Sequence, residues 1–303
     1  MKVMLIMFLT QPRSCIFPNE TGCDFMKLLK CSICVILSLM FCISSYANED
    51  VHLSDEQMLE VFDALEPDLL ENINGEYVTR ADAVNILYDM YYKDADLFIM
   101  PLTYCPYRDV KDEELYSKMR ALNTISPSPM IGLNSTKTFE PERNCKLAEF
   151  LKMSFCLGNF KQHLYMKEQY DNMEIYPDRY MLYSEQTGLI GKSEDSERFI
   201  TKDDVKSILS KLLFVKIYKV SNRYSFVPKS SIDCELITAM YGIKIENGKL
   251  NKLPGDKIKV GDTEITGSVD KSFYMKNCTA LYKEDGEEKV LYKVFADESQ
   301  AVD

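Results

Sequence analysis

Two cationic side chains occupy the same place in two similar sequence segments, where they could bind an anion. Arg80 lies in Val78-Thr79-Arg80-Ala81-Asp82-Ala83, and Lys202 lies in Ile200-Thr201-Lys202-Asp203-Asp204-Val205. A planar guanidinium can donate to both oxygens of a carboxylate or phosphate, whereas an ammonium acts as a point charge. Arg80 and Lys202 are therefore candidate ligand-binding residues.

The residues beside these cations form a helix-capping pattern. Thr79 with Asp82, and Thr201 with Asp204, have the spacing of a capping box, in which the hydroxyl accepts from the third residue's N–H and the acid accepts from the cap N–H. The acid also faces the positive end of the helix dipole. In this arrangement we expect the intervening basic residue to point outward, free to bind a ligand.

A third, weaker copy of the pattern occurs between these two. It reads Cys145-Lys146-Leu147-Ala148-Glu149-Phe150, with Lys146 at the cap position and Glu149 as the acid. Leu147 replaces the cation. A unit that occurs three times favours a small modular array over a single enzyme core.

Apolar spacing predicts six helices in the first two thirds of the chain. The first begins after Ser54, which forms a capping box with Gln57, and stops at Pro67. The others are expected at residues 79–91, 111–122, 146–157, 178–186 and 201–213.

The pattern changes after residue 213. Strand-like runs occur near residues 215–220, 257–265 and 290–295, and Asn247-Gly248, Pro254-Gly255 and Asp285-Gly286 are turn signals, the first a strong hairpin signal. We therefore predict an α+β protein, with a mainly helical domain at residues 48–213 and a small β-rich module at residues 214–303.

The N-terminal 47 residues have the order of a secretory signal peptide. A basic start at residues 26–30 precedes an uncharged apolar run at residues 31–43, and the small residues Ser45 and Ala47 follow. The run has about 13 residues, fewer than the roughly 20 of a spanning helix. We expect cleavage after residue 47, translation from Met26, and residues 1–25 as an upstream extension. An uncleaved N-terminal anchor is the alternative.

Charge and cysteine content limit the classes of partner and the redox state. The net charge of −11 disfavours nucleic acid and anionic lipid. Five cysteines follow the signal, at positions 105, 145, 156, 234 and 278. Because Cys234 and Cys278 both lie in the C-terminal region, they are the preferred disulfide pair in an exported protein. The odd number leaves at least one thiol free, and five buried thiols are the alternative.

The sequence contains no recognisable catalytic, metal or cofactor motif. Its two histidines, His52 and His163, lack partners at ligand or general-base spacing, and no phosphate loop or zinc motif follows the signal. The acidic clusters lack the spacing of a calcium loop. We therefore expect a non-enzymatic protein without cofactor or metal. A hydrolase with an accessory helical region is a third interpretation, because any acidic protein contains carboxylate pairs.

The repeated units resemble S-layer homology (SLH) repeats in degenerate form. Tyr107-Arg108-Asp109-Val110 resembles the family's aromatic-x-Asp-Val opening, and Phe139-Glu140-Pro141 resembles its Phe-x-Pro. Thr187-Gly188-Leu189-Ile190-Gly191 is similar to its glycine turn. The cap positions 79, 146 and 201 are 67 and 55 residues apart, close to the family's unit length. The resemblance covers roughly residues 50–213.

This resemblance implies a pseudo-threefold domain around a central helix bundle, with grooves that bind cell-wall glycopolymer. It gives the anion contact to Arg80, with Lys202 as a cationic substitute, and it implies that Leu147 silences the second groove. The family's usual Trp is missing, since the chain has none, so Tyr or Phe would have to stack on sugar.

The resulting hypothesis is a secreted cell-surface protein, anchored non-covalently to the cell envelope through SLH-like repeats. Its expected partners are a cell-wall polysaccharide or peptidoglycan-linked polymer and other envelope proteins, but no nucleic acid. The alternative is an exported scaffold or protein-interaction module whose SLH-like region has lost glycan binding.

Overall fold

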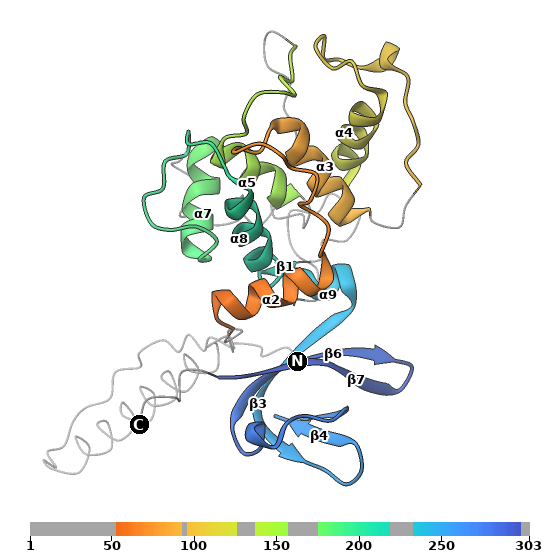
Figure 1. Ribbon diagram of the computed structural model, residues 1–303, viewed down its shortest axis with the longest axis vertical. Helices are drawn as coiled ribbons and strands as arrows, with labels where there is room; N and C mark the ends of the chain where they lie inside the picture. Colours follow the sequence, from red (N-terminus) through yellow and green to blue (C-terminus); the bar gives the residue numbers. More distant parts are fainter. Residues whose placement is uncertain (1–52, 93–95, 126–136, 157–174, 219–232, 298–303) are drawn as a thin grey trace, which may run out of the picture. The chain divides into compact units, whose positions relative to one another are not determined.

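The computed structural model describes residues 53–92, 96–125, 137–156, 175–218 and 233–297 (Figure 1). The predicted signal peptide, its expected start at Met26 and both histidines lie outside these ranges. The described part is α+β, as predicted, with helices first and a β-rich region after them.

Six helices in the described residues agree with the sequence pattern to within a few residues, and the last one, in the region predicted to be β-rich, was not predicted. They are α2 (Asp55–Leu65), α3 (Arg80–Tyr91), α4 (Glu113–Ile125), α5 (Leu147–Cys156), α7 (Tyr180–Gln186), α8 (Lys202–Leu212) and α9 (Leu236–Tyr241). Short turns of other helical types are η1 (Leu102–Tyr104), η3 (Ile175–Arg179) and η4 (Lys271–Phe273). The predicted Ser54 and Gln57 capping box is present at the start of α2.

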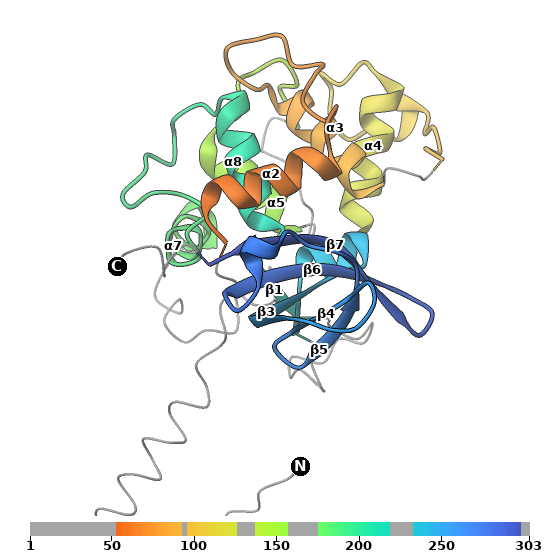
Figure 2. The same cartoon turned by 60° about the horizontal axis from the view of Figure 1, so that its bottom comes forward.

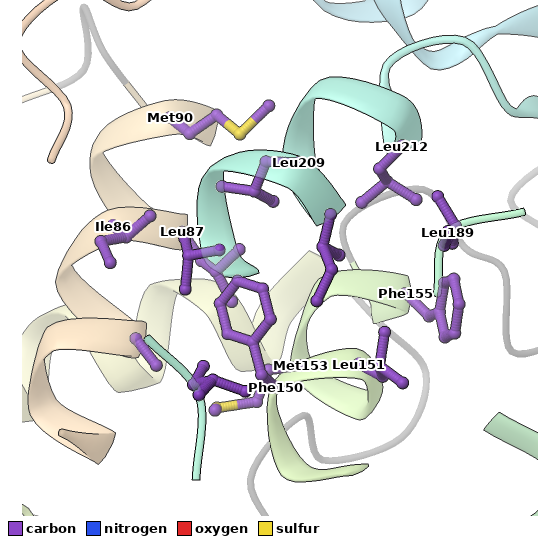
Figure 3. Packing of buried hydrophobic residues seen from close by; sticks show 14 of the residues in the cluster. Ile86, Leu87, Met90, Phe150, Leu151, Met153, Phe155, Leu189, Leu209 and Leu212 are labelled. Atoms are coloured by element: carbon purple, nitrogen blue, oxygen red, sulfur yellow. The ribbon is translucent and has the colours of Figure 1, made fainter. Parts of the chain in front are cut away.

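The apolar faces of α3, α5 and α8 pack against one another in the helical core (Figure 3). Leu87, Phe150 and Leu209 come from these three helices and are all fully buried. Burial of each such side chain contributes about 1.5–3 kcal/mol. The same core continues into the β-rich region through Leu236, Ile243 and Leu281. Within the described residues, the predicted division at residue 213 thus separates two kinds of secondary structure that share one core.

The segments that precede α3, α5 and α8 pair with one another through their backbones. Val78 N–H donates to the Ile200 carbonyl (2.9 Å), Ile200 N–H donates to the Cys145 carbonyl (3.1 Å), and Cys145 N–H donates to the Val78 carbonyl (2.8 Å). These three residues are fully buried. Antiparallel bridges between Tyr77 and Thr201, Thr79 and Asn144, and Lys146 and Phe199 flank the hydrogen bonds. The three helices therefore begin around a closed ring of backbone hydrogen bonds.

The last strands form a closed five-stranded barrel (Figure 2). A two-stranded sheet of β1 (Lys216–Tyr218) and β2 (Asp233–Glu235) comes first. The barrel comprises β3 (Ile243–Lys252), β4 (Lys257–Val260), β5 (Thr263–Thr266), β6 (Asn277–Asp285) and β7 (Glu288–Ala296), in the order β3-β4-β5-β7-β6, with β6 paired to β3. Closure leaves these strands without a long free edge.

Two predicted turns are confirmed and one is wrong. Pro254-Gly255 joins β3 to β4, and Asp285-Gly286 joins β6 to β7. Asn247-Gly248 instead lies inside β3, where Gly248 pairs with Cys278. A Cβ atom on Gly248 would lie 2.6 Å from the Gly261 Cα atom. Gly248 is therefore needed for close approach of two backbones, not for a hairpin turn.

None of the helices in the described ranges combines the length and apolar character needed to cross a bilayer.

Candidate functional site

The helix starts at α3 and α8 contain the predicted capping boxes. Thr79 Oγ1 accepts from the Asp82 N–H (3.1 Å), and Asp82 Oδ2 accepts from the Thr79 N–H (2.9 Å). At α8, Thr201 Oγ1 accepts from the Asp204 N–H (3.2 Å), and Asp204 Oδ2 accepts from the Thr201 N–H (2.8 Å). The roles predicted for these four residues are confirmed.

The helix start at α5 has half of this arrangement. Lys146 N–H donates to Glu149 Oε2 (3.1 Å), so Glu149 acts as predicted. Lys146 has no hydroxyl to accept the reciprocal bond, and its ammonium instead pairs with Glu197. Its side chain therefore joins the second helix start to the segment before the third.

Arg80 does not point outward as expected. Its Nε atom donates to the Phe139 carbonyl (2.8 Å), and its Nη1 atom donates to Glu149 Oε1 (2.5 Å). The guanidinium carbon lies 4.6 Å from the centroid of the Phe139 ring. Only 12% of the Arg80 side chain is exposed. The prediction of a free cation is therefore wrong, because the neighbouring unit supplies partners for the guanidinium.

Glu149 is the centre of this charged cluster. Arg143 Nη2 donates to the same Glu149 Oε1 atom (2.7 Å), and Arg143 Nε donates to Glu140 (2.7 Å). Burial acts to raise the pKa of Glu149, but the hydrogen bond from Arg143 and the charge of Arg80 lower it overall below its ordinary value. Glu149 is therefore ionised at neutral pH and joins the first two helix starts.

A similar arginine lies before the third helix start. Arg198 donates to both carboxylate oxygens of Asp204 (2.9 and 3.0 Å), and its Nε donates to Glu194 (2.8 Å). Sequence reasoning missed both Arg143 and Arg198. The available signal was an arginine three residues before the cap position in the second and third units; the first unit has Glu76 there.

Lys202 differs from Arg80 in its contacts. Its side chain is half-buried, and within the described residues it makes no hydrogen bond or ion pair. The adjoining bridge carries an edge-to-face aromatic pair, Tyr77 and Phe199, with ring centroids 5.8 Å apart. Phe199 is 41% exposed. No contact in the described residues joins Lys202 to Arg80. The two predicted ligand-binding residues therefore do not form one site.

Leu147 occupies the corresponding position in the second unit and is fully buried. Its N–H donates to the Arg198 carbonyl (2.9 Å). Its apolar side chain offers no charge for an anion.

The predicted disulfide between Cys234 and Cys278 is not formed. Cys278 is a free thiol in β6 and belongs to the apolar cluster inside the barrel. Its Sγ atom lies near the carbonyls of Phe273 and Lys276. Cys234 lies in β2, outside the barrel. Cys105 and Cys145 are also free thiols, and burial raises the pKa of Cys145.

The described residues contain no cluster of three or more His, Cys, Asp or Glu side chains that could hold a metal ion. No protein family model matches the chain, and no curated protein is similar to it in sequence.

Proposed function

We propose that this chain is an exported, non-enzymatic protein of the cell envelope, whose helical part is an SLH-like scaffold of three units related by pseudo-threefold symmetry. The closed ring through Val78, Cys145 and Ile200 supports this proposal, because each residue holds the same place in its unit and donates to one neighbour while accepting from the other. The signal-like order of residues 1–47 supports export.

The contacts of Arg80 favour a scaffold over a glycan anchor at the first helix start. An anionic ligand at Arg80 would have to compete with Glu149, whose side chain is only 16% exposed. Displacing one partner of a buried pair costs about 3–5 kcal/mol, because the remaining charge is left unpaired. Arg80 is therefore better suited to link two units than to bind a ligand.

The loop between α3 and α4 supports protein recognition. Phe98 is 78% exposed and Tyr104 is 69% exposed, and Ile99 lies beside them. Two hydrogen bonds from α4 side chains hold residues 100 and 104 of this loop: Met100 N–H donates to Ser117 Oγ (2.7 Å), and Tyr116 Oη donates to the Tyr104 carbonyl (2.7 Å). Exposed apolar side chains in a segment held in this way suit a protein contact, since side chains positioned beforehand lose less entropy on binding.

Co-purification of the mature chain from envelope extracts tests the scaffold. We expect a Phe98→Ser, Tyr104→Ser double variant to lose its protein partners, while Met275→Ser, which changes an exposed apolar residue on the barrel, retains them. Unchanged partners in the double variant would contradict the role of this loop.

Anchoring to wall glycopolymer at Lys202 is a second candidate function. It is favoured by a cation that has no side-chain partner among the described residues and adjoins the Tyr77 and Phe199 pair, since aromatic rings can stack on sugars and the ammonium can face a carboxylate. Sedimentation of the mature chain with purified wall sacculi tests this function. A Lys202→Ala, Phe199→Ala variant should remain in the supernatant, whereas a control change of the exposed Lys192 to Ala should not affect sedimentation. Equal sedimentation of all three proteins would rule out this site.

A further inference from the structure

The three helix starts are joined unequally, although the ring of backbone hydrogen bonds between them is closed. We call the contacts between the starts of α3 and α5 the first joint, those between α5 and α8 the second joint, and those between α8 and α3 the third joint. Each joint has one hydrogen bond of the ring and one antiparallel bridge. The joints differ in the contacts that they add to these two.

The first and second joints each add two backbone hydrogen bonds. In both, the first two N–H groups of one helix donate to carbonyls that lie three and five residues before the cap position of the next helix. The bonds run from the N–H of Arg80 to the carbonyl of Arg143 (2.9 Å), Ala81 to Pro141 (3.0 Å), Leu147 to Arg198 (2.9 Å) and Ala148 to Ser196 (3.1 Å). These two joints are therefore built alike.

The third joint lacks both of these bonds. The corresponding donors are the N–H groups of Lys202 and Asp203, and the corresponding carbonyls belong to Glu76 and Asn74. Within the described residues, none of these four groups makes a hydrogen bond. Since the first N–H groups of a helix have no partner inside the helix, those of α8 depend on water.

The first unit also lacks the arginine that the other two units place before the cap. Arg143 and Arg198 lie three residues before their cap positions and bind Glu149 and Asp204. Glu76 holds this place in the first unit. Its carboxylate lies beside the hydroxyl of the adjacent tyrosine, where its charge and a hydrogen bond raise the pKa of that hydroxyl. Glu76 therefore gives its own helix start no cation.

The segment at residues 72–77 is held at its ends and exposed between them, and we call it the strap. Leu70, just before it, is 6% exposed, and Val78, just after it, is fully buried. Residues 74–76 are exposed. The Val78 carbonyl also accepts from the Cys145 N–H at the first joint, so the end of the strap stays fixed when the strap itself moves.

The packing of α2 on α8 confines such a movement to the strap. Lys206 pairs with Asp63 (2.8 Å), and Lys211 pairs with Asp55 (2.6 Å). Both helices also bury apolar side chains in the common core. The strap can therefore leave the start of α8 while α2 and α8 remain together.

We propose that the strap is a conformational switch, which detaches from the start of α8 while the first and second joints stay closed. Detachment breaks the hydrogen bond from the Val78 N–H to the Ile200 carbonyl and separates the ring of Tyr77 from that of Phe199. It therefore changes the surface beside Lys202, which is the second candidate site, although the movement itself requires no ligand.

Hydrogen–deuterium exchange of the full mature chain, followed by NMR, tests the proposal. The N–H groups of Val78, Cys145 and Ile200 form a matched set, because each residue is buried and each N–H donates to one carbonyl of the ring. After correction for sequence-dependent intrinsic rates, we expect Val78 to exchange at least about tenfold faster than the other two, since local opening needs less free energy than unfolding of the whole protein.

A Glu76→Arg variant tests the cause of the difference. It gives the first unit the arginine of the other two, next to the capping carboxylate of Asp82, and should slow the exchange of Val78 about threefold. The matched control is Glu71→Arg, which makes the same change in charge at an exposed position just before the strap and should leave this rate unchanged. Circular dichroism and urea midpoints establish that both variants are folded.

Faster exchange at Val78 alone, slowed by Glu76→Arg more than by Glu71→Arg, supports the proposal. Equal protection of the three N–H groups in the wild type overturns it, as does an effect of Glu76→Arg no larger than that of the control. The wild-type comparison decides the matter by itself if a variant fails to fold. Because these measurements use neither a protein partner nor wall sacculi, a negative result leaves the proposed function standing.

Discussion

The cations of the helical part and those of the barrel differ in what they contact. Arg80, Arg143 and Arg198 each bind a carboxylate that caps a helix; Arg80 pairs with the acid of another unit, and the other two pair with the acid of their own unit. Lys249 and Lys276 face solvent without an acidic partner in the described residues. A cation at a motif position is thus no guide to ligand binding until its partners are known. Among the described residues, the same motif position holds a buried and paired cation in Arg80 and a cation without a side-chain partner in Lys202.

Of the changes that test this comparison, removal of the Glu149 carboxylate should reduce the stability of the protein most. Glu149→Ala leaves Arg80 and Arg143 without their shared carboxylate, so we expect the free energy of unfolding to fall by about 3 kcal/mol. Urea denaturation measures this change. As a control, Glu140→Ala removes a half-exposed partner of Arg143 and should cost about 0.5 kcal/mol. Similar values for the two variants would show that Glu149 does not tie the units together.

Acid should weaken the helical part through three carboxyl groups. The pKa values of Glu149, Asp204 and Asp109 are lowered: burial opposes the shift, while arginine hydrogen bonds for the first two and backbone N–H groups for Asp109 outweigh it. A lowered folded-state pKa gives stability that is present above the unfolded-state pKa, about 4, and is lost as pH falls through the folded value. Urea midpoints between pH 7 and pH 3 should fall less steeply in Glu149→Gln than in the wild type. Parallel curves would contradict this assignment.

Loss of a capping hydroxyl should have a smaller effect. Thr201→Ala removes the oxygen that accepts from the Asp204 N–H and should cost about 1 kcal/mol. Lys146→Ala, at the position without such an oxygen, is the matched comparison and should cost less. Thermal or urea unfolding would measure both, and the reverse order would show that the capping boxes contribute little.

The free lysines should have the smallest effect on stability. Lys202→Ala and Lys249→Ala should each change the free energy of unfolding by no more than about 0.5 kcal/mol, because neither side chain has a partner to lose among the described residues. A large loss in either variant would place that lysine with the structural arginines, and for Lys202 it would remove the residue from the second candidate function.

Local features of the fold could be predicted from the sequence. Capping hydroxyls and acids lie within three residues of one another, so Thr79 and Thr201 were identified correctly. The turns at Pro254-Gly255 and Asp285-Gly286 are likewise short-range features. The three related helix starts were found because their residues recur in one order.

Features that depend on distant partners could not be predicted. Arg80 and Glu149 form an ion pair although they are 69 residues apart in sequence, and no local sequence pattern predicts this pair. Gly248 was taken for a turn because its close approach to Gly261 exists only once the barrel forms. Cys278 was paired with Cys234 on the basis of sequence region, whereas barrel closure places Cys278 in the interior.

The ring of backbone hydrogen bonds also limits how the sequence of such a chain can evolve. Each of its three members completes the hydrogen bonding of the other two, so loss of one unit leaves an exposed donor and an exposed acceptor on its former neighbours. The segments between units are not subject to this restriction, as their unequal spacings of 67 and 55 residues illustrate. Insertions can therefore accumulate between the units, while deletion of a whole unit removes the cooperativity of the remaining pair.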